Sequence, residues 1–151
     1  MTLAQHRVLI VEDDLMIADA AEEFLLKCGY DVCGIARTTT EAIALGRLHA
    51  PDLVVIDLRL ADGGLGTDVA SELIAQGRRG ILYASANLAS FSLDTVNGDA
   101  CLAKPYTPND LLRSLEIVAD IVASGRPSEP FPQGFRVLPL AARHADDRMY
   151  G

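Results

Sequence analysis

The chain has 151 residues, half of them hydrophobic, and a formal net charge of −8; this length predicts a single domain with a substantial core. The negative charge disfavours nucleic acid and anionic membranes as partners, because proteins bind both through Lys and Arg, and no stretch approaches the roughly 20 apolar residues of a membrane span. The three cysteines lack metal-ligand spacing, and their odd number fits no closed set of disulfides, so we expect free thiols. No signal peptide precedes the first acids, and we therefore expect a soluble cytoplasmic protein.

Apolar runs that predict strands alternate with helical patterns along the chain. We expect strands at residues 6–12, 32–36, 53–57, 80–85 and 100–103, and helices at about 14–27, 38–49, 67–76 and 107–124, with a short helix around 90–96. Asp14 and Thr107 are suitable N-caps, and Pro108 suits the first helical turn. Five strand–helix units with right-handed crossovers predict a doubly wound α/β fold, in which two helical layers enclose a five-stranded parallel sheet.

The sequence changes character at Gly125. Four of the seven prolines lie beyond it. We therefore divide the chain into a domain of residues 1–124 and a Pro-rich tail of residues 125–151, which is too short for an output domain. The apolar residues between Phe131 and Leu140 favour docking of the tail on the domain or on a partner, whereas disorder is expected beyond Arg143.

Polar residues with complementary chemistry end four of the predicted strands. Glu12 and Asp13 follow the first strand, Asp57 the third, Ser85 the fourth and Lys104 the fifth. In a parallel α/β sheet the ligand crevice lies outside the carboxyl ends of the strands, so we expect these residues to meet there. Paired carboxylates bind a hard cation such as Mg²⁺. An Asp beside that cation is suited to accept a phosphoryl group, whose oxygens would be bound by Lys and Ser. The pattern predicts a phosphorylation switch.

These four motifs, in this order, resemble the receiver domain of bacterial two-component response regulators over about residues 6–124. The resemblance implies a flavodoxin-like sheet with strand order 2-1-3-4-5. It also implies that Asp57 is both the phosphoacceptor and a metal ligand, that Asp13 binds Mg²⁺ directly, and that Glu12 binds it through water. The backbone carbonyl of Arg59 is expected to supply a further metal ligand, whereas Asp14 is expected to cap a helix.

The resemblance assigns two further roles at the strand ends. Ser85 corresponds to the switch hydroxyl that turns toward the phosphoryl group. Lys104 corresponds to the lysine that pairs first with the carboxylates and then with the phosphoryl group, and the peptide before Pro105 is expected to be cis, as in family members.

The chain departs from the family pattern at Cys101. Many receivers carry an aromatic residue at this position, which swings inward on activation, so we expect that coupling to be absent or altered here. Tyr106 and Tyr83 are candidate substitutes, although packing is the expected role for Tyr83. Residues 86–98 contain many turn-forming side chains, and we expect this segment to be the most mobile part of the unphosphorylated domain and to become ordered on activation.

Three functions remain open at the level of sequence. The leading one is a stand-alone receiver, not an enzyme, that takes a phosphoryl group from a histidine kinase or phosphotransfer protein and acts on a downstream protein, as a monomer or homodimer. The second is a phosphorylation-independent binding module, which the complete set of site residues disfavours. The third is a phosphohydrolase with Asp57 as its nucleophile. Such enzymes usually need a carboxylate two residues further on, where this chain has Arg59.

Overall fold

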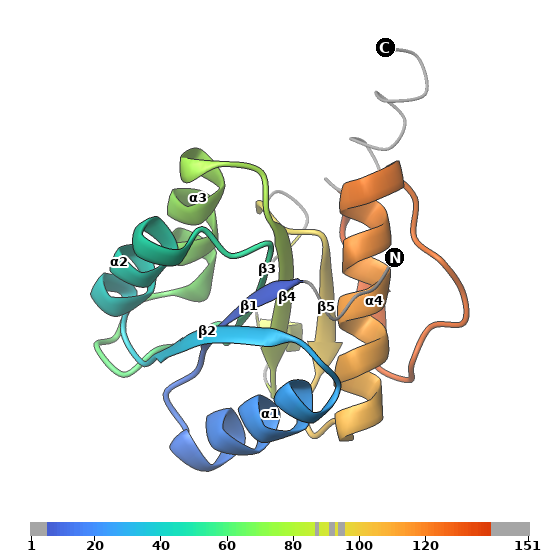
Figure 1. Ribbon diagram of the computed structural model, residues 1–151, viewed down its shortest axis with the longest axis horizontal. Helices are drawn as coiled ribbons and strands as arrows, with labels where there is room; N and C mark the ends of the chain where they lie inside the picture. Colours follow the sequence, from blue (N-terminus) through green and yellow to red (C-terminus); the bar gives the residue numbers. More distant parts are fainter. Residues whose placement is uncertain (1–5, 87, 91–92, 94–95, 140–151) are drawn as a thin grey trace.

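A central six-stranded sheet with helices on both faces forms the protein (Figure 1). The computed structural model describes residues 6–86, 88–90, 93 and 96–139. The strands are β1 (Arg7–Val11), β2 (Asp31–Ala36), β3 (Leu53–Ile56), β4 (Gly80–Ser85), β5 (Ala100–Ala103) and β6 (Phe135–Val137). The helices are α1 (Leu15–Lys27), α2 (Thr39–His49), α3 (Gly66–Gln76) and α4 (Pro108–Ser124), with a 3-10 turn at Leu88–Ser90.

The strand order is β2-β1-β3-β4-β5-β6. The first five strands are parallel and have the expected order. The sheet is larger than expected by one strand, because the tail residues Phe135–Val137 pair antiparallel with β5. Leu138, the next residue, is fully buried. The expected docking of the tail is thus observed as far as Leu138, whereas Leu140 and the segment beyond Arg143 lie outside the described residues.

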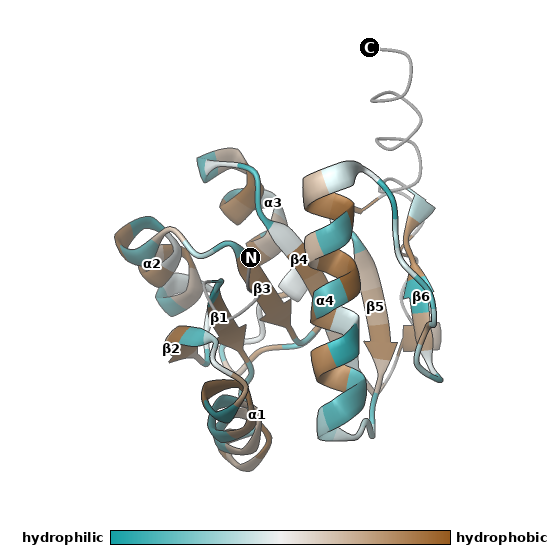
Figure 2. Ribbon diagram, turned by 45° about the vertical axis from the view of Figure 1, so that its right-hand side comes forward, coloured by the Kyte–Doolittle hydropathy of each residue, from teal (hydrophilic) through white to brown (hydrophobic). Residues whose placement is uncertain are grey.

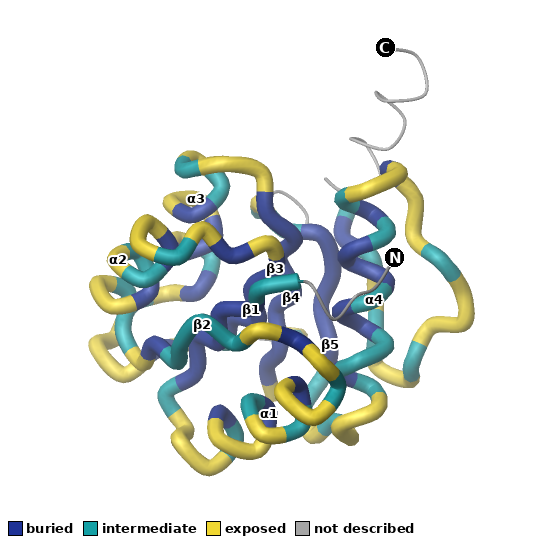
Figure 3. Tube along the Cα trace, in the orientation of Figure 1, coloured by how far each residue is buried: buried dark blue, intermediate teal, exposed yellow. Residues whose placement is uncertain are grey.

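Side chains on the strands alternate between two hydrophobic clusters, one on each face of the sheet. Helices α1 and α4 cover one face, and α2 and α3 cover the other (Figure 1). On β1, for example, Val8 and Ile10 pack toward α1 and α4, whereas Leu9 and Val11 pack on the opposite side. Strands β1, β3, β4 and β5 are apolar and buried along most of their length, whereas β2 and β6 at the edges are only partly buried, and the outer helix surfaces are polar and exposed (Figures 2 and 3). None of the helices in the described ranges is long and apolar enough to cross a membrane.

Helix starts agree with the local signals in the sequence. The Asp14 carboxylate caps α1 by accepting bonds from the amides of Met16 and Ile17, as expected. Thr107 caps α4 in a reciprocal capping box with Asp110. The helix expected at residues 90–96 falls largely outside the described residues, which show only the 3-10 turn at Leu88–Ser90. The predicted mobility of residues 86–98 therefore stays a prediction.

Helix α3 begins against the loop that follows β3. The amide of Gly66 donates to the carbonyl of Leu58 at 2.9 Å. A Cβ at Gly66 would lie 2.1 Å from the backbone oxygen of Asp57 and 2.8 Å from Cγ2 of Ile56. Because backbone cannot move aside as a flexible side chain can, only glycine fits at this contact. Gly66 thus allows α3 to hold the end of β3 in place.

We expect Gly66→Ala to destabilise the protein by about 2 kcal/mol, within the range for overpacked cores, because the new methyl group collides with the Asp57 backbone. Urea unfolding would measure the loss. Gly34→Ala is a matched control, since its Cβ would meet only the end of the Leu45 side chain at 3.2 Å. Equal stability of the two variants would contradict the close contact.

Candidate functional site

Three carboxylates converge at the carboxyl end of the sheet. Glu12 and Asp13 follow β1, and Asp57 follows β3, whose last residue Ile56 pairs with Val11 of β1. One carboxylate oxygen from each acid lies within 4.8 Å of the other two. The structure therefore brings together the three acids that the sequence placed at strand ends.

Asp57 is positioned by its backbone and remains accessible. Its amide donates to the carbonyl of Val11 at 2.9 Å, which ties it to the end of β1. Its Oδ1 accepts a bond of 2.7 Å from the amide of Leu58. The side chain is 14% exposed, so its carboxylate can still meet an incoming group.

Lys104 links two of the acids. Its Nζ lies 2.5 Å from Oε1 of Glu12 and 3.3 Å from Oδ2 of Asp57, and the lysine side chain is only 13% exposed. The Lys104 amide donates to the carbonyl of Ser85 at 3.0 Å, which joins the end of β5 to the end of β4. The peptide between Lys104 and Pro105 is cis, as expected. The ammonium group thus compensates the charge of a partly buried acidic cluster.

Burial and charge act in opposite directions on this cluster. Burial raises the pKa of Glu12 to about 7, although the bonds from Lys104 and from the amide of Asp14 favour the carboxylate. Burial by itself lowers the pKa of Lys104, but the bonds and charges of Glu12 and Asp57 outweigh it and hold that pKa above its ordinary value. Lys104 is therefore charged at neutral pH, whereas Glu12 titrates close to it.

The remaining predicted site residues lie near the acids. Ser85 ends β4, the strand next to β3, and is 4% exposed. Arg59 is exposed and forms an isolated bridge with Leu65 in the loop that follows Asp57. The roles of the Ser85 hydroxyl and the Arg59 carbonyl stay predictions.

The residues around the usual aromatic position lie in the core. Cys101 is 1% exposed and pairs in register with Tyr83 on β4 and with Arg136 on β6. Tyr83 is fully buried, and its hydroxyl donates to the carbonyl of Asn97. The packing role expected for Tyr83 is thus confirmed. Tyr106 is half-buried beside the site, where burial raises its pKa.

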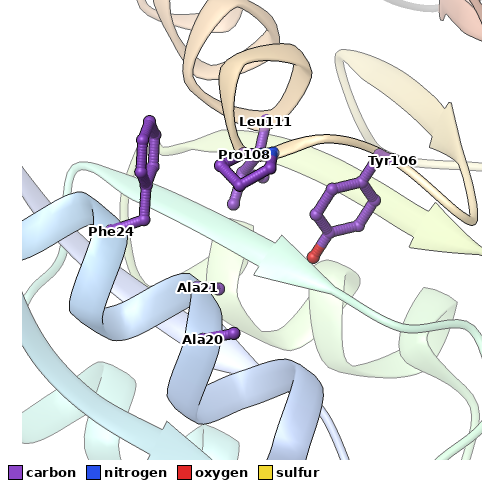
Figure 4. Close-up of a pocket in the computed structure, with 6 residues that line it drawn as sticks. All are labelled: Ala20, Ala21, Phe24, Tyr106, Pro108 and Leu111. Atoms are coloured by element: carbon purple, nitrogen blue, oxygen red, sulfur yellow. The ribbon is translucent and has the colours of Figure 1, made fainter.

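Two apolar hollows flank the site, and sequence reasoning missed both. One, of about 220 Å³, lies between α1 and the start of α4 (Figure 4) and is lined by Ala20, Ala21, Phe24, Tyr106, Pro108 and Leu111. The other, of about 320 Å³, is lined by Ile17, Ala86, Lys104, Pro105 and Tyr106. Tyr106 thus belongs to both hollows. The helical spacing of Ile17, Ala21 and Phe24 was the available signal, but it equally fits a face packed in the core.

Comparisons with known proteins agree with this geometry. Residues 8–116 match the family model of the response regulator receiver domain. The chain is 34% identical over 116 residues to the transcriptional regulatory protein PdtaR of Mycobacterium tuberculosis. This alignment covers 74% of this chain and 56% of PdtaR. It is 33% identical over 103 residues to the phyllosphere-induced regulator PhyR of Methylorubrum extorquens, with 67% of this chain and 39% of that protein covered. The chain therefore spans about half or less of the length of these relatives.

Solved structures give the same result. The CheY-like response regulator receiver domain protein from Methanospirillum hungatei matches with a TM-score of 0.69 at 28% identity, over 78% of this chain and 96% of that chain. The family model covers well over half of the chain, and the matched region contains every one of the strand-end residues described above. The chain belongs to the response regulator receiver domain family, the signalling modules of bacterial two-component systems.

Proposed function

We propose that this domain accepts a phosphoryl group on Asp57 from a histidine kinase or a histidine phosphotransfer protein, with Mg²⁺ bound, and thereby changes its contacts with a downstream protein. The observation that carries the proposal is the position of Lys104, whose ammonium group bridges Glu12 and the accessible Asp57. A cation poised beside a lone nucleophilic carboxylate suits the charge that a phosphoryl group would bring.

The acidic cluster fits Mg²⁺. Glu12, Asp13 and Asp57 offer three hard oxygen donors close enough to share one ion, and Mg²⁺ prefers one or two carboxylates together with water and phosphate oxygens. When bound, Mg²⁺ would supply positive charge that favours the transferring phosphoryl group. Asp13 and Asp57 would hold it directly, Glu12 would hold it through water, and the carbonyl of Arg59 would complete the protein ligands.

Transfer would be a simple displacement at phosphorus. An Asp57 carboxylate oxygen forms the new O–P bond while the N–P bond to the donor histidine breaks, and the imidazole leaves with the electron pair of that bond. Asp57 is ready for this role because the bond from the Leu58 amide fixes one oxygen, Oδ1, and holds the carboxyl group in one orientation. The chain's own contribution is thus orientation and charge, which are the main terms in phosphoryl transfer.

The product would reorganise the strand ends. A phosphoryl group adds about 1.5 to 2 negative charges and three acceptor oxygens at neutral pH. Lys104 would exchange its bond with Glu12 for one with the phosphoryl group, and the Ser85 hydroxyl would turn to donate to it. Since Ser85 and Lys104 are joined through their backbones, the two movements would occur together.

The apolar hollows beside the site suit a donor protein. Met16, on the first turn of α1, is 84% exposed, and the neighbouring Leu15 is 46% exposed. Phe24 and Tyr106 line the first hollow, and Tyr106 also lines the second hollow together with Lys104. A helical donor that presents its histidine among apolar residues would bury this surface, since exposed apolar patches commonly mark interaction sites.

The other two functions fit less well. A phosphohydrolase would need an acid or base two residues after Asp57, and that residue is the exposed Arg59. A phosphorylation-independent module would have no use for an accessible Asp57 surrounded by Glu12, Asp13 and Lys104 at these distances.

We expect acetyl phosphate to add one phosphoryl group to the protein only when Mg²⁺ is present. Asp57→Asn should abolish the labelling, because the amide nitrogen that replaces one oxygen cannot form the acyl phosphate. Intact-mass spectrometry would measure it. Asp62→Asn is the matched control, since Asp62 is an exposed carboxylate in the following loop and should not affect labelling. Undiminished labelling of the Asp57→Asn protein would refute the assignment.

Lys104→Met should uncouple the switch while preserving Mg²⁺ binding. Without metal the variant should be less stable than the wild type, because two acids lose their partner. Bound Mg²⁺ should restore the lost stability. Beryllofluoride, a phosphoryl mimic, should then no longer shift the amide resonance of Ser85. NMR spectra of this variant and of Lys27→Met, which loses an exposed lysine on α1, would test the role. A normal Ser85 shift in Lys104→Met would exclude it.

Glu12 should make the metal-free protein less stable as the pH rises. The folded state keeps the Glu12 proton up to about pH 7, whereas a carboxyl at its ordinary pKa of 4.5 loses it earlier. Between these values the folded state binds more protons than the unfolded one, so the contribution of Glu12 to stability falls with rising pH. Glu12→Gln should remove this slope.

Urea unfolding at several pH values, with a chelator present, would measure the slope. Exposed Glu72→Gln is the control and should behave as the wild type. Added Mg²⁺ should offset the loss at high pH, because metal binds the deprotonated carboxylate. If stability depends on pH in the same way in Glu12→Gln, another group is responsible for the slope.

A further inference from the structure

Residues 126–138, here called the strap, lie along the outer edge of the sheet. They follow the end of α4, run back alongside it (Figure 1) and end as β6 at the opposite edge of the sheet from β2 (Figure 2). Backbone bonds of 3.0 Å from the Ala103 amide to Gly134 and from the Leu138 amide to Asp99 extend the β5–β6 ladder at both ends. The strap thus covers an edge of β5 that would otherwise be open.

Side chains of α4 hold the strap as well. Arg113 donates to the carbonyl of Ser128 at 2.8 Å and to that of Pro130 at 3.0 Å. The Ser128 hydroxyl donates to Asp120. Ile117 and Ile121, both buried, form a small separate cluster with two partly buried strap residues, Phe135 and Val137. The strap therefore covers one flank of α4 as well as the edge of β5.

The strap meets the phosphorylation site at the end of β5. Ala103 pairs in register with Ser85 on one side and donates its amide to Gly134 on the other. Lys104 is the next residue. A Cβ at Gly134 would lie 3.3 Å from the Cβ of Ala103, and Gly134 has a φ of +82°. Glycine at this position thus permits the close approach of the strap to the residue that precedes Lys104.

We propose that the strap is an autoinhibitory element, seated on β5 and α4 in the unphosphorylated protein and released when Asp57 is phosphorylated. The inference rests on the proposed function, because it requires Ser85 and Lys104 to move toward a phosphoryl group. Release uncovers the edge of β5 together with Ile117 and Ile121 as the surface offered to the downstream partner.

The order of the strands sets the direction of the effect. Asp57 follows β3, and β6 lies on the other side of β5 from β3. A pull on Ser85 and Lys104 toward Asp57 is therefore a pull on Ala103 away from Gly134. The bond between Ala103 and Gly134 is the β5–β6 contact nearest the site, so it is the first to lengthen.

The strap is also weakly enough attached to be displaced. Its strand is three residues long, and among residues 126–138 only Leu138 is a fully buried hydrophobic side chain. Elements with few buried contacts open at low free energy and commonly serve as the moving parts of switches. Edge strands, by contrast, are normally kept covered because their open groups pair with other chains. A strap that covers the edge of β5 until activation is weak enough to be displaced and still protects that edge in the unphosphorylated protein.

A disulfide that locks the strap tests the proposal. Arg136 pairs directly with Cys101, so Arg136→Cys in a chain carrying Cys28→Ser and Cys33→Ser provides two thiols on adjacent strands. With Mg²⁺ present, the oxidised protein should bind beryllofluoride at least about fivefold more weakly than the reduced protein, the lower end of typical coupling between sites. Arg136→Ser in the same background is the control and should not respond to reduction.

Amide exchange of the unmodified chain tests the same coupling without a crosslink. The amides of Ala103 and Leu138, whose bonds cross from β5 to the strap, should exchange at least about fivefold faster when beryllofluoride and Mg²⁺ are bound. The amide of Gly80, which donates to Asp52 on the β3 side of β4, should not change. Equal beryllofluoride affinity of oxidised and reduced protein, or unchanged exchange at Ala103 and Leu138, would overturn the autoinhibitory role alone. Failure of every form to bind beryllofluoride would contradict the proposed function, and the inference with it.

Discussion

The contact of Lys104 with Glu12 and Asp57 is the interaction on which the rest of the structure depends. Burying carboxylates close together is unfavourable unless a cation compensates them, and removing one partner of a buried ion pair costs about 3–5 kcal/mol. Here the ammonium group lies 2.5 Å from Glu12 and 3.3 Å from Asp57. Without metal, the fold tolerates its acidic cluster because this lysine directly follows β5.

That contact requires the parallel topology. Residues 12, 57 and 104 are far apart in the sequence and meet only because β1, β3 and β5 end on the same side of one sheet. The apolar strands hold those ends in register, since each inserts alternate side chains into clusters on both faces. Gly66 adds a local constraint where α3 touches the backbone of Asp57. The burial that stabilises the sheet therefore also fixes the distances within the site.

Features set by local sequence could be predicted, and those set by long-range packing could not. Strands β1 to β5, the caps Asp14 and Thr107, and the strand-end acids follow from short patterns and from one topological rule. Strand β6 was not predicted, because three residues after a Pro-rich segment carry little strand signal. They become a strand only by pairing with β5. The Arg113 contacts with the strap and the hollow beside Phe24 were missed for the same reason.

Cys101 and the strap are best understood together. An aromatic residue at position 101 would give the domain a bulky group able to occupy two positions, whereas a buried cysteine is too small for that role. In this chain Cys101 pairs with Arg136, so the outer edge of β5 carries a short added strand. Under the proposed release, a pull at Ala103 would displace this three-residue strand, which is held by a few backbone bonds, by Arg113 and by limited apolar packing. A displaceable backbone segment can thus supply the two-state behaviour that a single side chain at position 101 lacks.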